Sequence, residues 1–356
     1  PCTALRFGFG QSNPTYRITD ARGRHWVLRR KPAGRLMSPT AHRIDREYRV
    51  MRALGAAGVD FPVPAMHLMA ADDTHTVGAP FYVMGYVDGV VYEDVMLHSV
   101  PSTPAKYAIL REAMRVLATL HSLDYRQLGL ADLGREGQYY PRQIERMTQL
   151  ARVQAEVGVA HAKSPGLALP SLTAARAPVP AIAGLEHLGP WFAANGPPDH
   201  TCLIHGDFKL DNLMYARSPA AKPGDAPSKP TVLALIDWEL ATLGHPLADL
   251  ANFLMPWYHV GSTAATRRRA GPMEPLADRP PPLGLPDARE LMAWYLADRA
   301  AMAAPTRSTP KRPSPLPLDA DGVPCGFLAA RVFSYVRVLV IMQGILARMV
   351  LGQASS

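Results

Sequence analysis

The chain has 356 residues, of which 48% are hydrophobic and 19% are charged, and this balance excludes a wholly disordered protein. Lysine and arginine outnumber aspartate and glutamate by 38 to 30, so the net charge of +8 favours anionic partners such as nucleotides or phosphorylated metabolites. Three cysteines, Cys2, Cys202 and Cys325, are too far apart for a metal knuckle or a disulfide framework. We therefore expect a reducing intracellular compartment, either the cytoplasm or an organelle matrix.

The first 90 residues predict several strands and one helix. Residues 15–20 and 25–30 form a plausible hairpin around a short polar turn. The segment 38–54 begins with cap-forming residues and carries apolar side chains at helical spacing, which predicts a helix. Residues 80–89 contain another short apolar strand that ends at an Asp-Gly pair.

Helices dominate the remainder of the chain. They are predicted over residues 104–123, 139–157, 285–303 and 326–350, with two short apolar runs at 201–204 and 231–236 between them. The fold class is therefore α+β, with a small β-rich lobe over residues 1–88 and a larger helical lobe over residues 89–356.

Proline accounts for 35 residues and is concentrated near 218–230, 262–286 and 304–318, so we expect these segments to be surface insertions. The most apolar stretch, Val338–Ala347, has ten residues and is bracketed by arginines. A membrane span needs roughly 20 apolar residues, so this stretch predicts a buried helix and no membrane span.

Two polar motifs follow the short apolar runs. His205, Asp207 and Asn212 come directly after the first run, and Asp237 ends the second. An aspartate after a strand and an asparagine five positions later can converge on one pocket, where one would orient a hydroxyl and the other would bind Mg²⁺. Phosphoryl transfer needs such a set, together with cations over the phosphates. The alternative is that these residues only form turns and caps.

These motifs, HGDFKLDN and IDWELATLGHPLADLAN, resemble those of the aminoglycoside phosphotransferase superfamily, which has a protein-kinase-like bilobal fold. The segments GQSNPTY, WVLRRKPAG, DREYRVMRAL and PFYVM resemble one branch of it more narrowly. That branch includes the N-terminal kinase domain of acyl-CoA dehydrogenase family members 10 and 11. The resemblance covers nearly the whole chain.

The resemblance implies roles at the matching positions. Asp207 would accept or orient the proton of the substrate hydroxyl, Asn212 and Asp237 would hold Mg²⁺, and His205 would be a structural member of the catalytic loop. Asp249 would brace that loop by hydrogen bonds, or alternatively serve only as a carboxylate at a helix N-terminus.

In the small lobe, Arg29 falls where kinases have their nucleotide-positioning lysine. Glu47 lies on the apolar stripe of the following helix, and a buried carboxylate needs a partner, so we expect an Arg29–Glu47 ion pair. The alternative is a solvated Glu47 at the edge of the stripe. By resemblance, the strand near residue 84 would offer backbone groups from Met84 to Tyr86 to the base of the nucleotide.

Residues 7–16 would form the loop over the phosphates, although a plain hairpin turn is the alternative. Its candidate nucleotide-binding residues are Gly8, Gly10, Gln11, Ser12 and Asn13. The branch usually has two adjacent glycines here, whereas Phe9 separates them in this chain. The strand expected before the loop is not apparent in the sequence, so we expect the first lobe to be incomplete at its N-terminus.

The predicted function is an ATP- or GTP-dependent, Mg²⁺-requiring kinase that phosphorylates a hydroxyl of a small molecule. The branch implies a hydroxy acid or hydroxyacyl-CoA as acceptor, and the chain could be fused to an acyl-CoA dehydrogenase domain or stand alone. One alternative is a kinase for an aminoglycoside, choline-like or sugar-amine acceptor. Another is a non-catalytic binding module with a kinase fold. No nucleic-acid partner is expected, since no basic-aromatic motif accompanies the positive charge.

Overall fold

The computed structural model describes residues 2–8, 13–32, 43–56, 58, 60–72, 76–162, 179–217, 230–258, 284–303 and 315–350. The chain divides into two compact units. The first consists of Pro1–Arg135 with Cys202–Pro315, and the second of Glu136–Thr201 with Leu316–Ser356. The three proline-rich segments lie for the most part outside the described residues. The division of the chain into lobes at residues 88 and 89 stays a prediction.

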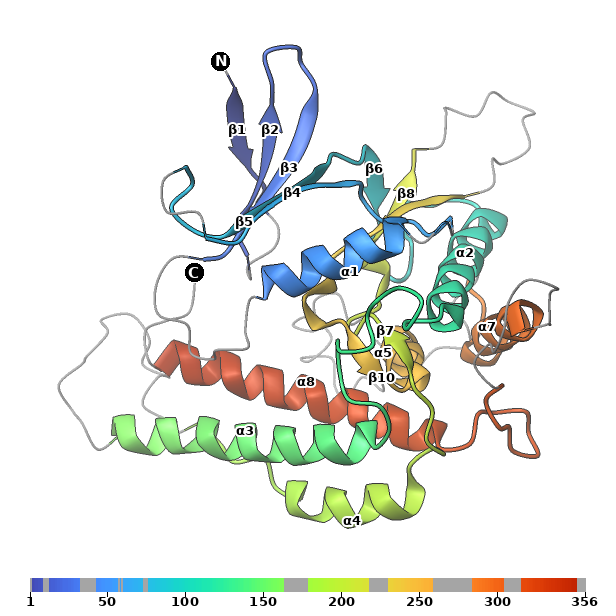
Figure 1. Cartoon of the computed structure of the whole chain (residues 1–356). Coiled ribbons are helices and arrows are strands. Elements are labelled where there is room, and N and C mark those ends of the chain that lie inside the picture. Colours follow the sequence, from blue (N-terminus) through green and yellow to red (C-terminus); the bar gives the residue numbers. More distant parts are fainter. Residues whose placement is uncertain are drawn as a thin grey trace. The chain divides into compact units, whose positions relative to one another are not determined.

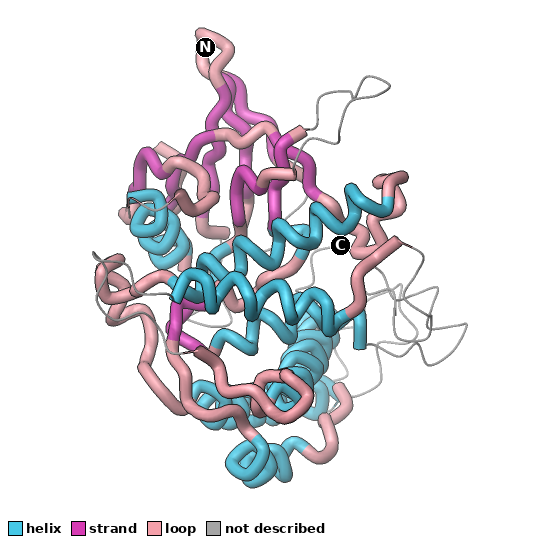
Figure 2. The backbone as a smooth tube through the Cα atoms, turned by 90° about the vertical axis from the view of Figure 1, so that its right-hand side faces the viewer, coloured by secondary structure: helices cyan, strands magenta, loops and turns pink. Residues whose placement is uncertain are grey.

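A five-stranded antiparallel sheet opens the first unit, in the order β1-β2-β3-β5-β4 (Figures 1 and 2). Its strands are β1 (Thr3–Arg6), β2 (Thr15–Thr19), β3 (His25–Arg30), β4 (Met66–Ala70) and β5 (Phe81–Gly85). The predicted hairpin is formed by β2 and β3, which are joined by a turn at Asp20–Arg24. Strand β3 pairs with β5 so that Arg29 lies opposite Tyr82.

Strand β1 corrects one expectation from the sequence. Residues 3–6 pair antiparallel with β2, from Thr3 opposite Thr19 to Arg6 opposite Tyr16. The segment 7–16 therefore does have a strand before it. All four residues of β1 are exposed, so this edge strand carries no apolar alternation from which it could be predicted.

Helix α1 (Ile44–Ala56) lies beside the sheet and presents its apolar stripe to it. The predicted helix is thus present, although the first part of the predicted segment, up to residue 42, lies outside the described residues. Two arginines tie α1 to the rest of the unit. Arg46 donates from Nε to the carbonyl oxygen of Ala241 at 2.9 Å and from Nη2 to that of Leu133, and Arg49 pairs with Asp132.

The rest of the first unit is mainly helical. Its helices are α2 (Thr103–Ser122), α5 (Pro246–Tyr258) and α7 (Ala288–Ala303), and α2 packs against α7. Two small sheets accompany them: β7 (Cys202–Ile204) with β10 (Thr242–Gly244), and β6 (Gly89–Val91) with β8 (Leu213–Ala216) and β9 (Val232–Leu235). Two 3₁₀ helices, η1 (Leu210–Asn212) and η2 (Trp238–Leu240), follow β7 and β9. This α+β architecture confirms the predicted fold class.

The second unit contains α3 (Tyr139–Ala162), α4 (Leu185–Asn195) and α8 (Phe327–Val350), and α3 packs against both of the others. Its core includes an aromatic cluster in which Tyr140 contacts Phe192 and Phe333.

Helix α8 is only half buried, which corrects the expectation of a buried helix. Val340, Gln343 and Ala347 are buried, whereas Leu339 and Met342 are among the exposed apolar residues. By length and composition alone, Phe327–Met349 could cross a membrane, a test that core helices of many soluble proteins also pass.

Candidate active site

A cavity of about 790 Å³ lies in the first unit. It is lined by strands β3 and β5, by α1, and by the segments that follow β7 and β9. Six residues singled out from the sequence line it: Arg29, Glu47, Met84, Tyr86, Asn212 and Asp237. The fold thus brings Arg29 and Asp237, which are 208 positions apart in the chain, to one cavity.

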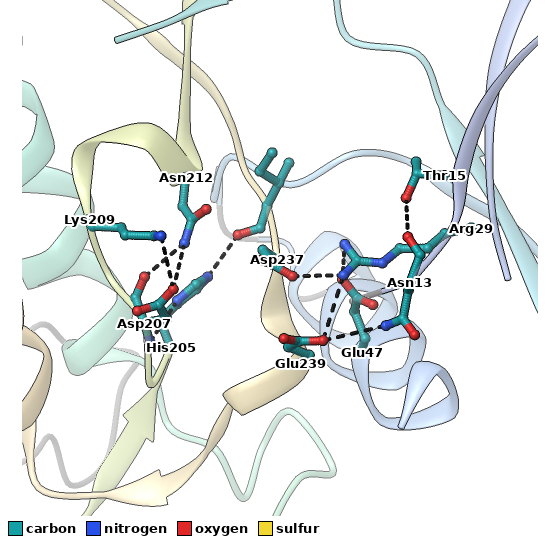
Figure 3. A network of polar contacts seen from close by, with 11 residues as sticks. Asn13, Thr15, Arg29, Glu47, His205, Asp207, Lys209, Asn212, Asp237 and Glu239 are labelled. Atoms are coloured by element: carbon teal, nitrogen blue, oxygen red, sulfur yellow. Dashed lines mark hydrogen bonds and ion pairs between the residues drawn. The ribbon is translucent and has the colours of Figure 1, made fainter. Parts of the chain in front are cut away.

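Arg29 is the centre of a network of ion pairs in this cavity (Figure 3). Its Nη1 lies 3.2 Å from Oε1 of Glu47, so the expected strand–helix ion pair is present. Its Nη2 donates to Oδ1 of Asp237 at 2.8 Å and lies 3.8 Å from Oε2 of Glu239. The guanidinium thus joins the small-lobe strand and helix to the aspartate that follows β9.

Burial and charge act in opposite directions on this network. Burial raises the pKa of Glu47 to about 7, since its side chain is 1% exposed, and Asp237 and Glu239 add to the increase while Arg29 opposes it. Burial lowers the pKa of Arg29, but Glu47, Tyr82 and Asp237 together outweigh it and raise the pKa overall. The guanidinium is therefore a permanent cation in the cavity.

This environment makes stability depend on pH. Between pH 4.5, the ordinary pKa of the group, and about 7, the native state keeps the Glu47 proton that the unfolded state loses. Stability should therefore fall as pH rises through this window, by about 3 kcal/mol for this group. We expect E47Q, which cannot ionise, to show a shallower slope when the free energy of unfolding is measured without nucleotide from pH 5 to 8. The control is E112Q, in which another buried glutamate loses the carboxylate that pairs with an arginine, here the half-exposed Arg115 on α2. Equal slopes in wild type and E47Q would contradict the prediction.

The loop after β7 turns sharply at Gly206. This residue has φ +83°, and a Cβ there would lie 2.4 Å from the carbonyl oxygen of Leu240, so only glycine fits. His205 is fully buried and hydrogen-bonds backbone groups on both sides. Its Nε2 donates to the carbonyl oxygen of Ile236 at 2.9 Å, and its Nδ1 accepts from the N–H of Asp207 at 3.2 Å. His205 therefore holds the loop in shape.

Asp207 and Asn212 meet, as the motif suggested (Figure 3). The amide nitrogen of Asn212 donates to the backbone carbonyl of Asp207 at 2.9 Å and lies 3.4 Å from its Oδ2. These contacts orient the side-chain amide of Asn212 with its nitrogen toward Asp207. The amide oxygen, which is the atom that could bind a metal ion, therefore points away from Asp207.

Lys209 was not predicted from the sequence. Its Nζ lies 3.4 Å from Oδ2 of Asp207 and 3.2 Å from Oδ2 of Asp211. Burial lowers the pKa of Lys209, but the two carboxylates outweigh it and raise the pKa overall. The signal that could have revealed it is the alternation of acid, base and acid at every second position of the loop.

Asp237 has an unusual backbone. Its φ of 67° and ψ of 57° place a residue other than glycine in the left-handed region, which costs about 1–3 kcal/mol. This conformation ends β9 and starts η2.

Glu239, two positions further on, was also missed. Its Oε2 lies 3.4 Å from Nδ2 of the buried Asn13, and so it links the start of β2 to the segment after β9. The sequence feature that could have revealed Glu239 is an acidic residue two positions after the predicted metal ligand Asp237.

The remaining predicted residues are placed only in part. Gly10, Gln11 and Ser12 lie outside the described residues, while Gly8 lies at the end of the described segment after β1 and Asn13 contacts Glu239. Met84 and Tyr86 line the cavity, and the N–H of Gly85 between them donates to the carbonyl of Ala65 at 2.8 Å.

Asp249 at the start of α5 braces the loop. Its Oδ2 accepts from the N–H of His205 at 2.7 Å, and its Oδ1 from the N–H of Gly206 at 2.8 Å. His121 of α2, fully buried, contacts Oδ2 through Nε2 at 3.2 Å. Burial alone would raise the pKa of Asp249, but the hydrogen bonds from His121 and from the backbone N–H of His205 contribute to a net decrease.

Comparisons with known proteins identify the family of the chain. The model of the phosphotransferase enzyme family, APH, matches residues 3–305. Acyl-CoA dehydrogenase family member 10 of Mus musculus is 35% identical over 362 residues, which cover 100% of this chain and 27% of that protein. Acyl-CoA dehydrogenase family member 11 of Gallus gallus is 40% identical over 69% of this chain and 27% of its own length. The chain thus spans about a quarter of the length of these relatives.

Two solved structures share the fold. A candidate aminoglycoside phosphotransferase from Ralstonia eutropha has a TM-score of 0.66 at 31% identity, and the match covers 100% of this chain and 86% of that one. An ethanolamine kinase from Plasmodium vivax has a TM-score of 0.54 at 12% identity, with coverage of 100% and 77%. The second likeness shows a common fold alone.

Proposed function

The chain belongs to the phosphotransferase enzyme family, and from this premise we propose that its cavity transfers the γ-phosphoryl group of ATP or GTP to a hydroxyl of a hydroxy acid or hydroxyacyl-CoA. The observation that carries the proposal is that Arg29, Asn212 and Asp237 line one cavity, and that Asn212 holds Asp207 by a hydrogen bond at its edge. A candidate base, oxygen ligands and a permanent cation are the parts that phosphoryl transfer requires.

In the proposed reaction, the carboxylate of Asp207 accepts the proton of the acceptor hydroxyl. The freed oxygen forms a bond to the γ-phosphorus while the bond from that phosphorus to the β–γ bridging oxygen breaks, and the nucleoside diphosphate leaves. The ammonium group of Lys209 lies 3.4 Å from this carboxylate and pairs with it. Arg29 is the cation available to the nucleotide phosphates, as a planar fork of donors.

The residues present fit a magnesium ion. Among the described residues no group of three His, Cys, Asp or Glu side chains could hold a metal by itself. Mg²⁺ commonly binds through one or two protein oxygens together with substrate phosphates, and Asn212 and Asp237 supply such oxygens at the cavity wall. When bound, the ion would neutralise phosphate charge. Asn212 is pre-oriented for this by its bonds to Asp207.

The acceptor class is supported by two observations. This chain matches part of relatives that are named as acyl-CoA dehydrogenase family members and are about four times as long. In such a polypeptide, the kinase would be linked to acyl-CoA chemistry. The net charge of +8 also suits an anionic acceptor.

A second candidate acceptor is cationic, such as an amino sugar or an amino alcohol. Glu93, Asp94 and Asp211 line the cavity in addition to Glu47 and Asp237, whereas Arg29 and Lys209 are its only lysine or arginine lining residues among the described part of the chain. An ammonium group would find carboxylate partners there.

A substrate panel separates the two candidates. The protein with Mg²⁺·ATP or Mg²⁺·GTP would be offered hydroxyacyl-CoAs, free hydroxy acids, aminoglycosides and choline-like alcohols, with diphosphate release and product mass as readouts. We expect phosphorylation of the hydroxyacyl-CoA or hydroxy acid group, and loss of product in D207N. Turnover confined to the cationic acceptors would overturn the proposed class and favour the second candidate.

A further inference from the structure

The buried carboxylate of Asp249 presents an electrostatic problem. It is 1% exposed, and among the described residues no lysine or arginine pairs with it directly. Three donors surround it: the N–H groups of His205 and Gly206, and Nε2 of His121. An ionised group in the interior is costly unless a compensating positive charge is within reach.

A chain of hydrogen bonds leads from Asp249 to such a charge. Nδ1 of His121 lies 2.8 Å from the hydroxyl of Tyr295 on α7, and Nη1 of Arg299, one turn further along α7, lies 3.3 Å from the same hydroxyl. All four side chains are buried, Arg299 to 7% exposure. The Arg299 guanidinium also lies 5.9 Å from the centre of the Tyr295 ring.

With His121 neutral, the two ends of this chain fix the direction of every hydrogen bond in it. A guanidinium can only donate and a carboxylate can only accept. Arg299 therefore donates to the oxygen of Tyr295, the Tyr295 hydroxyl donates to Nδ1 of His121, and Nε2–H of His121 donates to Asp249. Every hydrogen bond in the chain is donated in the direction of the carboxylate. The bonds therefore polarise and strengthen one another.

The protonation states agree with this direction. Burial lowers the pKa of His121, which keeps the imidazole neutral with one proton to donate. Burial also raises the pKa of Tyr295 and so keeps its hydroxyl protonated. The positive charge of the chain therefore resides on Arg299.

We propose that Arg299, acting through Tyr295 and His121, supplies the positive charge that holds Asp249 ionised, and thereby positions the loop that carries Asp207. Arg299 and Tyr295 are positioning residues, since neither lines the cavity. The inference rests on the loop 205–212 as the catalytic loop of the proposed function, but it does not depend on which acceptor is phosphorylated.

Amide hydrogen exchange of the loop tests the inference without any substrate. The N–H groups of His205 and Gly206 should exchange about tenfold faster in Y295F, which cuts the chain, and in R299M, which removes the charge. R299K, which keeps the charge, should be closer to wild type than R299M. Amides of β3, such as those of Val27 and Leu28, report global opening and serve as the internal reference in every variant.

Y215F is the matched control. Tyr215 is 1% exposed, and its hydroxyl donates to the carbonyl of Ile109 at 3.1 Å, so this variant also loses one buried hydroxyl hydrogen bond to α2. We expect loop exchange in Y215F to stay near the wild-type rate relative to β3. Equal loop exchange in Y295F and Y215F would overturn the relay, and equal exchange in R299K and R299M would overturn the role of charge. Because no nucleotide or acceptor is present, these outcomes are independent of a failed acceptor panel.

Discussion

D207N should lower turnover by roughly 10²–10⁴ while nucleotide affinity stays largely intact. The asparagine amide cannot accept the hydroxyl proton, yet it keeps the size of the side chain and the backbone carbonyl that Asn212 contacts at 2.9 Å. The measurement is steady-state turnover with the best acceptor of the panel, beside the affinity for Mg²⁺·ATP from a thermal shift titration.

The matched control for this prediction is D211N. Asp211 lines the cavity, lies 3.2 Å from the same Lys209 and would undergo the same change of charge, but it does not occupy the position of the proposed base. We expect its loss of turnover to be less than about tenfold. Wild-type turnover in D207N, or an equal loss in the two variants, would show that Asp207 is not the base.

D237A should abolish the Mg²⁺-dependent part of nucleotide binding. In wild type, a nucleotide at 100 times its Kd stabilises the native state by roughly 2.7 kcal/mol, which is visible as a rise in the melting temperature. Alanine removes a carboxylate from the cavity wall and leaves Arg29 without the partner at 2.8 Å, so any residual shift should no longer depend on Mg²⁺. The measurement is melting with ATP or GTP, each with Mg²⁺ and with a chelator.

D211A controls for the loss of an acidic residue from the cavity and should keep the Mg²⁺-dependent shift. A Mg²⁺-dependent shift that survives in D237A would contradict the assignment of this residue to the metal. If wild type shows no shift with either nucleotide, the non-catalytic binding module becomes the better interpretation of the chain.

The sequence predicted the parts of the site whose spacing is local. The motif that contains His205, Asp207 and Asn212 lies within eight positions, and the apolar runs before it and before Asp237 identify strands. The Arg29–Glu47 pair followed from a different argument, since a carboxylate on an apolar helix stripe requires a partner.

The chain of hydrogen bonds behind Asp249 could not be predicted in this way. His121 and Tyr295 are 174 positions apart in the chain. In the sequence, neither differs from an ordinary residue of an amphipathic helix. Only the packing of α2 on α7 brings the two side chains together. Lys209 and Glu239 were missed for another reason, because charged residues in a loop are usually solvated and carry no pattern of burial.

The hydrophobic pattern of the sequence did not predict the edge strand β1 or the exposed side of α8. β1 is exposed along its whole length and is held by backbone pairing with β2, which periodicity does not report. In α8 the sequence is apolar on nearly every face, so composition alone did not distinguish the buried Val340 from the exposed Leu339.

The left-handed backbone at Asp237 bears on how variants of this protein should be selected. Glycine occupies that conformation without strain, and its introduction would also remove a carboxylate that faces the buried Glu47 and the nearby Glu239. A library ranked by heat resistance alone would register the relief of this strain by glycine, although that replacement deletes the proposed metal ligand and the 2.8 Å hydrogen bond to Arg29. Selection of variants of this protein therefore has to score the proposed turnover alongside thermal tolerance.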